Sequence, residues 1–436
     1  MARVPRALEE RLTLEIAALD AEGRGVARNA EGKVVFVEGA LPGETVEALR
    51  LYGRRSFDTA RAVSILRESP ARRAPRCPSF GVCGGCATQH ADARTQVAAK
   101  QRWLEDCLAR IGKVNPGTLL APLHGDEWGY RRRARLSVRY VPAKGALVGF
   151  RERRSTYVAE MSSCDVLPPF VSALIPRLRE LVGALSIRDR VPQIELAAGD
   201  DATVLVFRHL LPLAAEDEAM LRRFADDTGV HVWLQPAGPD SAAPLHPARR
   251  DVLHYSLPEF GIRIAFEPTD FTQVNDPINR ALVSRVIRML DPRPGERIAD
   301  LFCGLGNFSL PIARLGADVI GFEGVRALVE RARANAAANG LVAQFEAADL
   351  FRSRIDAFGP FDKILLDPPR EGALEILKTL GAGWPARIVY VACDPATLAR
   401  DAAVLVHTKG YALEAAGVVN MFPHTAHVES VALFQR

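Results

Sequence analysis

The sequence contains no long hydrophobic run. A transmembrane helix needs about 18 consecutive apolar residues, and none of the 436 residues belongs to such a stretch. The first residues, MARVPRALEERLTLEIAALD, carry charge but lack the apolar core of a secretory signal. We therefore predict a cytoplasmic protein that has no membrane partner.

Cysteine is scarce as well, with seven residues in the whole chain. Without a secretory signal, these cysteines are expected to be thiols, metal ligands or catalytic groups rather than disulfides. Hydrophobic residues at 48% and charged residues at 25% are ordinary for a folded globular protein. The length allows two or three domains.

Acidic residues are nearly absent from two arginine-rich stretches. Residues 50–76 hold eight arginines against Asp58 and Glu68, and residues 128–154 hold nine basic residues against Glu152. A solvated basic surface is one explanation. The aromatic residues interleaved in both stretches favour a polyanion, because arginine binds phosphate in a bidentate way and stacks on bases. We therefore expect RNA, and not DNA, as the partner.

The pattern of apolar residues changes along the chain. Alternation with glycine turns over residues 11–66 is typical of a small β-barrel. A helix is expected over 92–111, another near 171–184, and a surface loop over 235–250. From about Asn275 helices alternate with buried strands, which indicates a doubly wound, mostly parallel α/β sheet closed by an antiparallel strand. The predicted domains are an OB-like RNA-binding barrel at 1–68, a mixed α+β central domain at 69–265, and a Rossmann-like α/β domain at 266–436, on which the helical segment at about 92–120 is a candidate to pack.

A nucleotide-type turn follows the first strand of the α/β domain, in DLFCGLGNFSLPIARLGADVIGFEG. Gly304 and Gly306 let the backbone approach a ligand closely, and Glu323 ends the next strand, where it can accept both ribose hydroxyls. Ser309 stands where the dinucleotide fingerprint has its third glycine. A pyrophosphate needs that close approach, so the turn disfavours NAD and FAD and favours S-adenosylmethionine, which carries no phosphate.

Further polar residues end the following strands. Asp349 ends the third strand, the DPPR motif at 367–370 ends the fourth, and Cys393 ends the fifth, RIVYVA. The carboxyl ends of parallel strands share one edge, where open α/β sheets bind their ligands. This sheet resembles that of a class I methyltransferase, which implies that Cys393 shares a crevice with the cofactor.

A thiol beside a methyl donor is suited to methylation of a carbon atom, namely carbon 5 of uracil. Carbon 5 of uracil is too weakly nucleophilic to attack a methylsulfonium, but a thiolate that adds to carbon 6 makes carbon 5 carbanion-like. The carbon-5 proton must then leave to a base before the thiol is eliminated. Glu429, in HVESVALF, is the candidate proton acceptor, with His424 and His427 as alternatives.

These residues resemble motifs of the RNA uracil-C5 methyltransferases: FTQVN at 271–275, DLFCGLGNFSLPIA, DPPR, YVACDPATLARD and HVESVALF. The resemblance implies that Cys393 is the nucleophile and Glu429 the proton acceptor. The N-terminal barrel, with GRGVAR and VFVEGALPGETV, resembles the RNA-binding TRAM domain of that family. The residues that the resemblance assigns to S-adenosyl-L-methionine are Gln273, Phe302, Asn307, Glu323, Asp349 and Asp367.

Four cysteines form a possible sulfur site. CPSFGVCGGCATQH supplies Cys77, Cys83 and Cys86, and MSSCDVL supplies Cys164. Three closely spaced thiols with a distant fourth suit zinc and an iron–sulfur cluster equally well by spacing. Within the family this signature resembles the iron–sulfur members that act on 23S ribosomal RNA, and only that resemblance implies a 4Fe-4S cluster. The remaining two cysteines, Cys107 and Cys303, fit structural positions better.

Three other functions compete with methylation of a uridine in 23S ribosomal RNA. The nearest is a uracil-C5 enzyme for another ribosomal site or for transfer RNA, although transfer-RNA members of the family generally lack the barrel and the cysteines. A non-catalytic RNA-binding ribosome-assembly protein would need neither Cys393 nor Glu429. An amino-group methyltransferase would use the DPPR strand end without a thiol. We predict a 23S ribosomal RNA enzyme that acts as a monomer.

Overall fold

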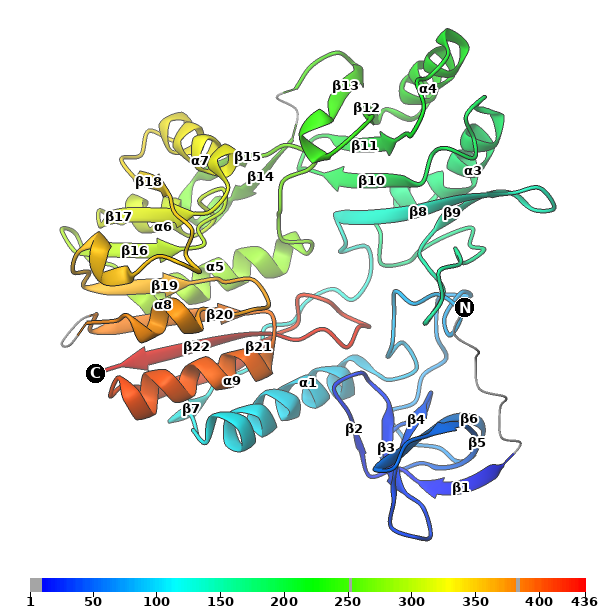
Figure 1. Ribbon diagram of the computed structural model, residues 1–436, viewed down its shortest axis with the longest axis horizontal. Coiled ribbons are helices and arrows are strands. Elements are labelled where there is room, and N and C mark those ends of the chain that lie inside the picture. Colours follow the sequence, from blue (N-terminus) through cyan, green and yellow to red (C-terminus); the bar gives the residue numbers. More distant parts are fainter. Residues whose placement is uncertain (1–9, 251–252, 382–384) are drawn as a thin grey trace. The chain divides into compact units, whose positions relative to one another are not determined.

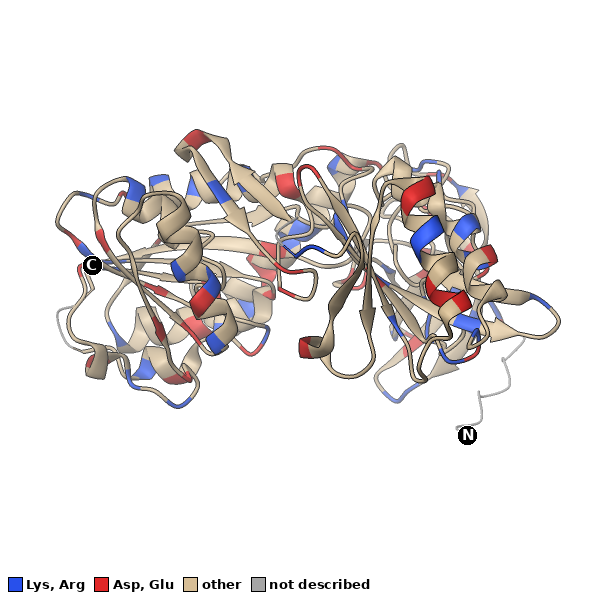
Figure 2. Ribbon diagram, turned by 90° about the horizontal axis from the view of Figure 1, so that it is seen from above, with Lys and Arg blue, Asp and Glu red and all other residues tan. Residues whose placement is uncertain are grey.

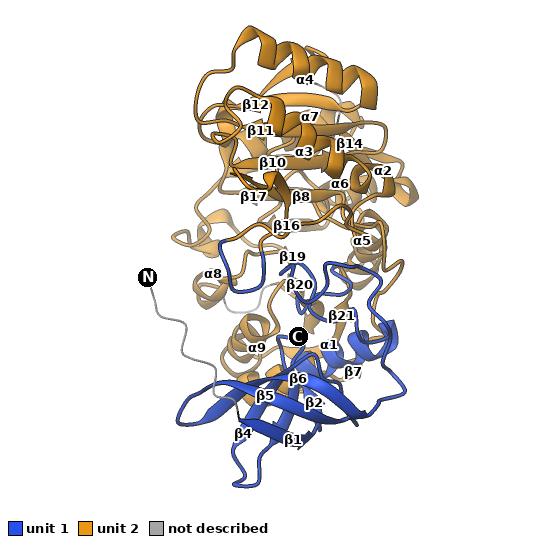
Figure 3. Cartoon of the chain, turned by 90° about the vertical axis from the view of Figure 1, so that its right-hand side faces the viewer, with its two compact units in different colours: residues 1–103, 152–156, 422–427 blue, residues 104–151, 157–421, 428–436 orange. Residues whose placement is uncertain are grey.

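The computed structural model describes residues 10–250, 253–381 and 385–436. The chain forms two compact units, which have separate colours in Figure 3. The first unit contains residues 1–103, 152–156 and 422–427, and the second contains 104–151, 157–421 and 428–436. The domain boundaries expected at residues 68 and 265 stay predictions.

The first unit contains the expected β-barrel. Its strands follow the order β1-β5-β6-β4-β3-β2, and the chain just after β1 closes the ring, because the Ala17 N–H donates to the Val26 carbonyl at 2.9 Å. Alternate residues fill the interior, and Val35 and Val37 of β4 are fully buried. The strands are β1 (Arg11–Glu15), β2 (Ala18–Leu19), β3 (Gly25–Arg28), β4 (Val34–Glu38), β5 (Thr45–Gly53) and β6 (Phe57–Arg67).

The helix expected over 92–111 is present as α1 (Ala93–Cys107), which continues into a π-helical turn, η1 (Leu108–Gly112). Asp92 begins it, since its carboxylate accepts the Thr95 N–H at 2.8 Å. The turn ends at Lys113, whose φ of 54° is left-handed. The helix is therefore predicted correctly, except for its last turn.

A mixed sheet occupies one part of the second unit, with strand order β13-β12-β11-β10-β8-β9 (Figure 1). The loop predicted over 235–250 is wrong in part, because β13 (Ala243–His246) lies within it and pairs with β12. Leu245 is buried there, so an apolar side chain anchors this edge strand together with its pairing to β12. The other elements are β8 (Arg133–Val141), β9 (Gly145–Gly149), α2 (Pro169–Ser172), α3 (Leu174–Ala184), β10 (Gln193–Ala198), β11 (Thr203–Arg208), α4 (Ala215–Thr228), β12 (His231–Gln235) and η2 (Pro239–Ser241).

The predicted α/β sheet forms the other part of this unit, with strand order β18-β17-β16-β19-β20-β22-β21-β7. The strands from β18 to β20 are parallel, and β22 is antiparallel to both of its neighbours. The strands are β16 (Arg297–Leu301), β17 (Asp318–Glu323), β18 (Gln344–Ala347), β19 (Lys363–Leu366), β20 (Arg387–Ala392), β21 (Ala412–Val419) and β22 (Glu429–Gln435), with β7 (Thr118–Leu119) added at the edge.

Helices connect the parallel strands of this sheet. Such crossover helices cover both faces of a parallel sheet, so its central strands are apolar on both faces. Val389 and Tyr390 of β20 are both fully buried, although they point to opposite faces. The remaining elements are β14 (His254–Leu257), η3 (Pro258–Phe260), β15 (Ile262–Ala265), α5 (Asp276–Leu290), α6 (Ser309–Arg314), α7 (Arg326–Ala338), η4 (Ile355–Phe358), α8 (Leu374–Lys378), α9 (Pro395–Ala403) and η5 (Val404–Thr408). None of the helices in the described ranges is long and apolar enough to cross a membrane.

Candidate active site

Cys393 and Glu429 come together through strand register. Cys393 directly follows β20, and Glu429 begins β22. The two strands are antiparallel, with Ala392 opposite Ser430, so the same register continued by one residue would bring Cys393 opposite Glu429. Opposite residues of an antiparallel pair project from the same face. Cys393 is partly exposed and Glu429 is buried.

The thiol of Cys393 lies among carboxylates. Burial raises its pKa to about 12, and the negative charges of Glu429, Asp367 and Asp394 act in the same direction. Arg370 opposes them and lowers the pKa. The thiol is therefore protonated at neutral pH in this arrangement, and a thiolate needs positive charge or a proton acceptor nearby.

Asp367 is the carboxylate at the end of β19. Burial raises its pKa well above the usual value, and the charges of Glu429 and Asp300 raise it further. Two further acidic side chains, from β16 and β22, thus act on Asp367. Such crowding favours the protonated form of Asp367.

The glycine turn after β16 points its backbone toward Glu323 of β17. Gly304 donates its N–H to Glu323 Oε2 at 3.2 Å, and Val325 donates to Oε1 at 2.9 Å. Phe302 has a φ of 66° and Gly304 a φ of 55°. A left-handed non-glycine residue is uncommon and is often found at ligand sites.

Ser309 has a partner that the sequence did not reveal. Its Oγ lies 2.5 Å from Asp300 Oδ2, and both residues are fully buried. Burial raises the pKa of Asp300 to about 7, while the bonds from Ser309 lower it. The serine at the third glycine position therefore donates a hydrogen bond to a buried acid.

Asn307 is held by two residues that carry no recognisable motif. Asn279 and Asn307 exchange two hydrogen bonds, and the Tyr255 hydroxyl also donates to Asn307 Oδ1. Gln273 lines a small pocket together with Tyr255, Asn279 and Arg132. Two predicted cofactor residues, Gln273 and Asn307, are thus linked through shared neighbours.

Asp349 follows β18, the edge strand of the α/β sheet. Its Oδ1 accepts the Phe351 N–H at 3.1 Å, and Arg352 lies 3.5 Å from its Oδ2. The Phe351 ring lies against Phe302, with 5.7 Å between ring centroids. The acid and the glycine turn therefore share an aromatic neighbour.

His424 is tied to its own unit. Its Nδ1 lies 3.2 Å from Gln96 Nε2, and its backbone N–H donates to Gln96 Oε1 at 2.8 Å. Its carbonyl accepts the N–H groups of Ala87 and Thr88. His427 packs edge-on against Phe422, with 4.5 Å between ring centroids. These contacts give His424 a structural role within the first unit.

The cysteine loop lies in the first unit, and Cys164 lies in the second. Cys83 is buried, and its sulfur accepts the Gly85 N–H at 3.4 Å, while Cys77 and Cys86 are partly exposed. An N–H directed at sulfur fits a thiolate ligand. Within the described residues, no three His, Cys, Asp or Glu side chains are grouped so that they could hold one metal ion. The 4Fe-4S cluster stays a prediction.

Many arginines of the two predicted RNA-binding stretches are ion-paired. Figure 2 shows acidic and basic residues interspersed along the ribbon. Arg54 and Arg55, between β5 and β6, are exposed, so uncompensated positive charge is more restricted than the sequence count indicates. The pairs in these stretches include Arg50 with Asp58, Arg61 with Glu38, Arg72 with Glu44, Arg132 with Asp200, Arg135 with Glu195 and Arg154 with Glu38.

Known proteins resemble the chain over nearly its whole length. The tRNA (Uracil-5-)-methyltransferase family matches residues 250–352 and 346–436, and the TRAM domain family matches 6–49. Two relatives are each named 23S rRNA (uracil(1939)-C(5))-methyltransferase RlmD. The one from Azoarcus sp. (strain BH72) is 60% identical over 431 residues, which cover 97% of this chain and 99% of that protein. The one from Thiobacillus denitrificans is 61% identical over 429 residues, with the same coverage.

One solved structure matches the fold over a similar extent. It is the Pyrococcus abyssi tRNA (uracil-54, C5)-methyltransferase in complex with S-adenosyl-L-homocysteine, with a TM-score of 0.75 and 24% identity. The match covers 97% of this chain and 99% of that one. At this identity, the likeness shows a common fold.

Proposed function

This chain belongs to the RNA uracil-C5 methyltransferase family, and we propose that it methylates carbon 5 of one uridine in 23S ribosomal RNA, with S-adenosyl-L-methionine as the methyl donor. The observation that carries the proposal is that Cys393 and Glu429 lie at adjoining ends of the paired strands β20 and β22, each one residue beyond the Ala392–Ser430 pair. Relatives at 60% identity named as 23S enzymes support the choice of RNA. A ribosomal substrate agrees with the predicted cytoplasmic location.

Cys393 acts first in this mechanism. Its sulfur adds to carbon 6 of the uracil, the C5–C6 double bond opens, and carbon 5 gains the electron pair with which it takes the methyl group. Because burial raises the pKa of this thiol to about 12, its proton has to pass to water before the sulfur adds to the uracil. Arg370 lowers that pKa and therefore favours the thiolate, against the neighbouring carboxylates.

Glu429 acts after methyl transfer. It removes the proton from carbon 5, the C5–C6 double bond re-forms, and the sulfur leaves carbon 6. A carboxylate opposite the nucleophile suits this task, since the proton and the sulfur sit on adjacent carbons. His424, bonded to Gln96, is the less suitable base.

The donor supplies an electrophilic methyl group when it is bound. Glu323 is oriented by two backbone N–H groups, which leaves its oxygens further lone pairs for ribose hydroxyls. Gln273, Asn307, Phe302 and Asp349 would also contact the donor. Asp367, whose pKa burial raises, would face the donor beside the thiol.

The four cysteines are proposed to hold a 4Fe-4S cluster, with Cys77, Cys83, Cys86 and Cys164 as ligands. The Gly85 N–H directed at Cys83 supports a thiolate there.

The proposal is tested by incubating 23S RNA transcripts with the protein and methyl-labelled S-adenosylmethionine, then mapping the product by mass spectrometry. A single 5-methyluridine in 23S RNA is expected, with none in 16S RNA or transfer RNA. Methylation of transfer RNA alone would contradict the ribosomal assignment, and methylation of a base nitrogen would contradict the chemistry.

A further inference from the structure

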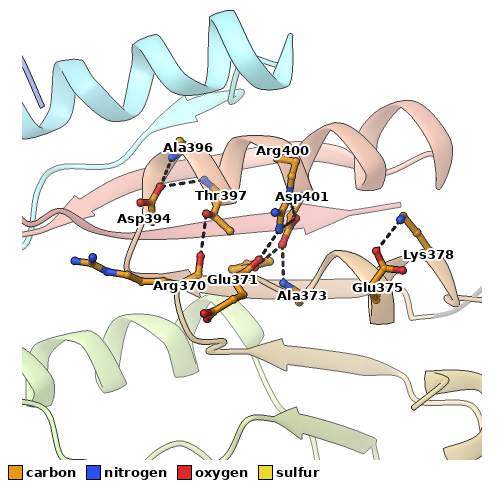
Figure 4. A network of polar contacts seen from close by, with 11 residues as sticks. Arg370, Glu371, Ala373, Glu375, Lys378, Asp394, Ala396, Thr397, Arg400 and Asp401 are labelled. Atoms are coloured by element: carbon orange, nitrogen blue, oxygen red, sulfur yellow. Dashed lines mark hydrogen bonds and ion pairs between the residues drawn. The ribbon is translucent and has the colours of Figure 1, made fainter. Parts of the chain in front are cut away.

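The loop after β19 is fastened to the helix that follows Cys393. Thr397 Oγ1 donates to the Arg370 carbonyl at 3.0 Å, and Arg400 Nη2 donates to the Glu371 carbonyl at 2.7 Å (Figure 4). The Ala373 N–H donates to Asp401 at 2.8 Å. Three backbone groups of the DPPR loop are thus bonded to α9.

Asp401 is the centre of this network. It is fully buried, and its Oδ2 accepts both the Ala373 N–H and the Tyr390 hydroxyl, the latter at 2.7 Å. Its Oδ1 accepts two N–H groups from Arg400, at 2.9 and 2.7 Å. A buried carboxylate that accepts four hydrogen bonds links strand, loop and helix rigidly.

Gly372 shows how closely the loop approaches the helix. It has a φ of 79°, and an added Cβ would lie 2.4 Å from the Thr397 methyl and 2.6 Å from Asp401 Oδ2. A side chain at this position would therefore push the loop away from α9. The close fit holds the DPPR loop in one place with respect to the Cys393–Asp394 turn that begins α9.

The Arg370 side chain extends away from the Asp401 side of the network in Figure 4. The charged groups that act on the Cys393 thiol are Glu429 from β22, Asp367 and Arg370 from the loop after β19, and Asp394 at the start of α9. Arg370 is the cation among these four, and its backbone is what Thr397 holds.

We propose that Asp401 is a positioning residue for the reaction at Cys393: by fastening the DPPR loop to α9, it keeps the Arg370 guanidinium near the thiol, where it stabilises the thiolate. The inference rests on the proposed role of Cys393 as nucleophile. It explains why a fully buried carboxylate, eight residues after the thiol, is bonded to the loop that carries the arginine.

The test is the rate at which Cys393 is alkylated by iodoacetamide, from pH 7 to 10, in full-length protein without RNA. Only the thiolate reacts, and mass spectrometry of the peptide separates Cys393 from the other cysteines. Asp401→Asn and Arg370→Gln should each slow alkylation about three- to tenfold across this range, because weakening the attraction to one cation raises the thiol pKa by up to about one unit. Arg370→Lys should restore most of the rate, and the double variant Asp401→Asn/Arg370→Gln should be no slower than Arg370→Gln.

Asp217→Asn is the matched control. Asp217 is also a buried carboxylate that fastens a segment to a helix, since it accepts the Ser186 N–H at 2.8 Å and the Ala214 N–H at 3.2 Å. This variant should lose stability as Asp401→Asn does, yet alkylate at the wild-type rate. Should Asp401→Asn not fold, Thr397→Val removes one loop bond and should slow alkylation in the same direction by a smaller factor.

An unchanged or faster alkylation rate in Asp401→Asn or Thr397→Val, with Arg370→Gln slowed, would overturn the positioning role. An unchanged rate in Arg370→Gln would overturn the electrostatic role. Because the measurement contains no RNA and no methyl donor, it is independent of the target assignment, which the methylation assay tests separately.

Discussion

Asn279 of α5 and Asn307 of the glycine turn exchange two hydrogen bonds, each 3.0 Å long. The amide of Asn307 is therefore fixed in one orientation before any ligand binds, and the Tyr255 hydroxyl holds the same oxygen from another side at 3.0 Å. A side chain fixed in this way loses little entropy when it contacts a donor molecule.

Removing the hydroxyl that holds Asn307 should weaken donor binding. Tyr255→Phe is expected to raise the KM for S-adenosylmethionine about three- to tenfold, the effect of losing one buried hydrogen bond, with kcat within about twofold. Steady-state kinetics at saturating RNA would measure both. Tyr411→Phe is the control, since that buried hydroxyl donates to the Pro385 carbonyl at 2.7 Å and should lose stability only. A change in kcat alone would contradict the assignment.

Substitutions of Cys393 and of Glu429 should stop the reaction at different steps. Cys393→Ala should form no covalent complex with RNA, whereas Glu429→Gln should add, methylate, and then stall before the carbon-5 proton leaves. Denaturing gel electrophoresis should therefore show an RNA–protein adduct with Glu429→Gln and none with Cys393→Ala. Turnover by Cys393→Ala would refute the whole mechanism.

A substrate with 5-fluorouridine should trap the wild-type enzyme in the same adduct, since fluorine cannot leave as a cation. His427→Ala provides the comparison for the base. If it accumulates adduct while Glu429→Gln turns over normally, the base assignment is wrong and the nucleophile assignment stands.

The cysteine loop should bind iron. Protein purified without oxygen is expected to be brown and to contain about four irons per chain, the content of a 4Fe-4S centre. Cys83→Ser should lose the colour, and Cys107→Ser, at a buried cysteine in α1, should keep it. Metal analysis with stoichiometric zinc and no iron would contradict the cluster.

Exposed arginines of the barrel should contribute most to RNA affinity. Arg54→Gln/Arg55→Gln is expected to reduce the slope of log affinity against log salt by about 0.7 to 0.9 for each phosphate that the variant no longer neutralises. Arg11→Gln is the control, because Arg11 lies 3.0 Å from Glu47 and carries a compensated charge. Filter binding at several salt concentrations would measure the slopes. Equal slopes for both variants would show that the β5–β6 hairpin does not bind RNA.

Stability should depend on pH through Asp300. Its pKa is raised from 3.8 to about 7, so between about pH 4 and 7 the folded chain keeps a proton that the unfolded chain has released. The contribution of this group to the free energy of unfolding therefore falls as pH rises through that window, and it is constant below and above it. Asp300→Asn removes the titration, so urea unfolding should give a wild-type minus variant difference that decreases from about pH 4 to 7.

Asp356→Asn is the control for that measurement. The bond from Arg354 lowers the pKa of this exposed acid, so its contribution is lost as pH falls below the unfolded value, with the opposite sign. A flat difference curve for Asp300→Asn would mean that the buried acid does not titrate in this range.

Periodicity and turn residues in the sequence determined the barrel, the doubly wound sheet and the carboxyl-edge position of Cys393. These features depend on the local periodicity of apolar residues, which can be read directly from the sequence. The loop expected over 235–250 was the exception, because one buried leucine, Leu245, supports strand β13 there.

Only the tertiary structure decided which residues act on one another at the site. The approach of Glu429 to Cys393, the amide exchange between Asn279 and Asn307, and the bond from Ala373 to Asp401 all join residues that are far apart along the chain. The number of arginines could likewise be read from the sequence, but the acidic residues with which they form ion pairs could not. Such contacts depend on strand register and helix packing over long separations, and no local pattern of residue types encodes them.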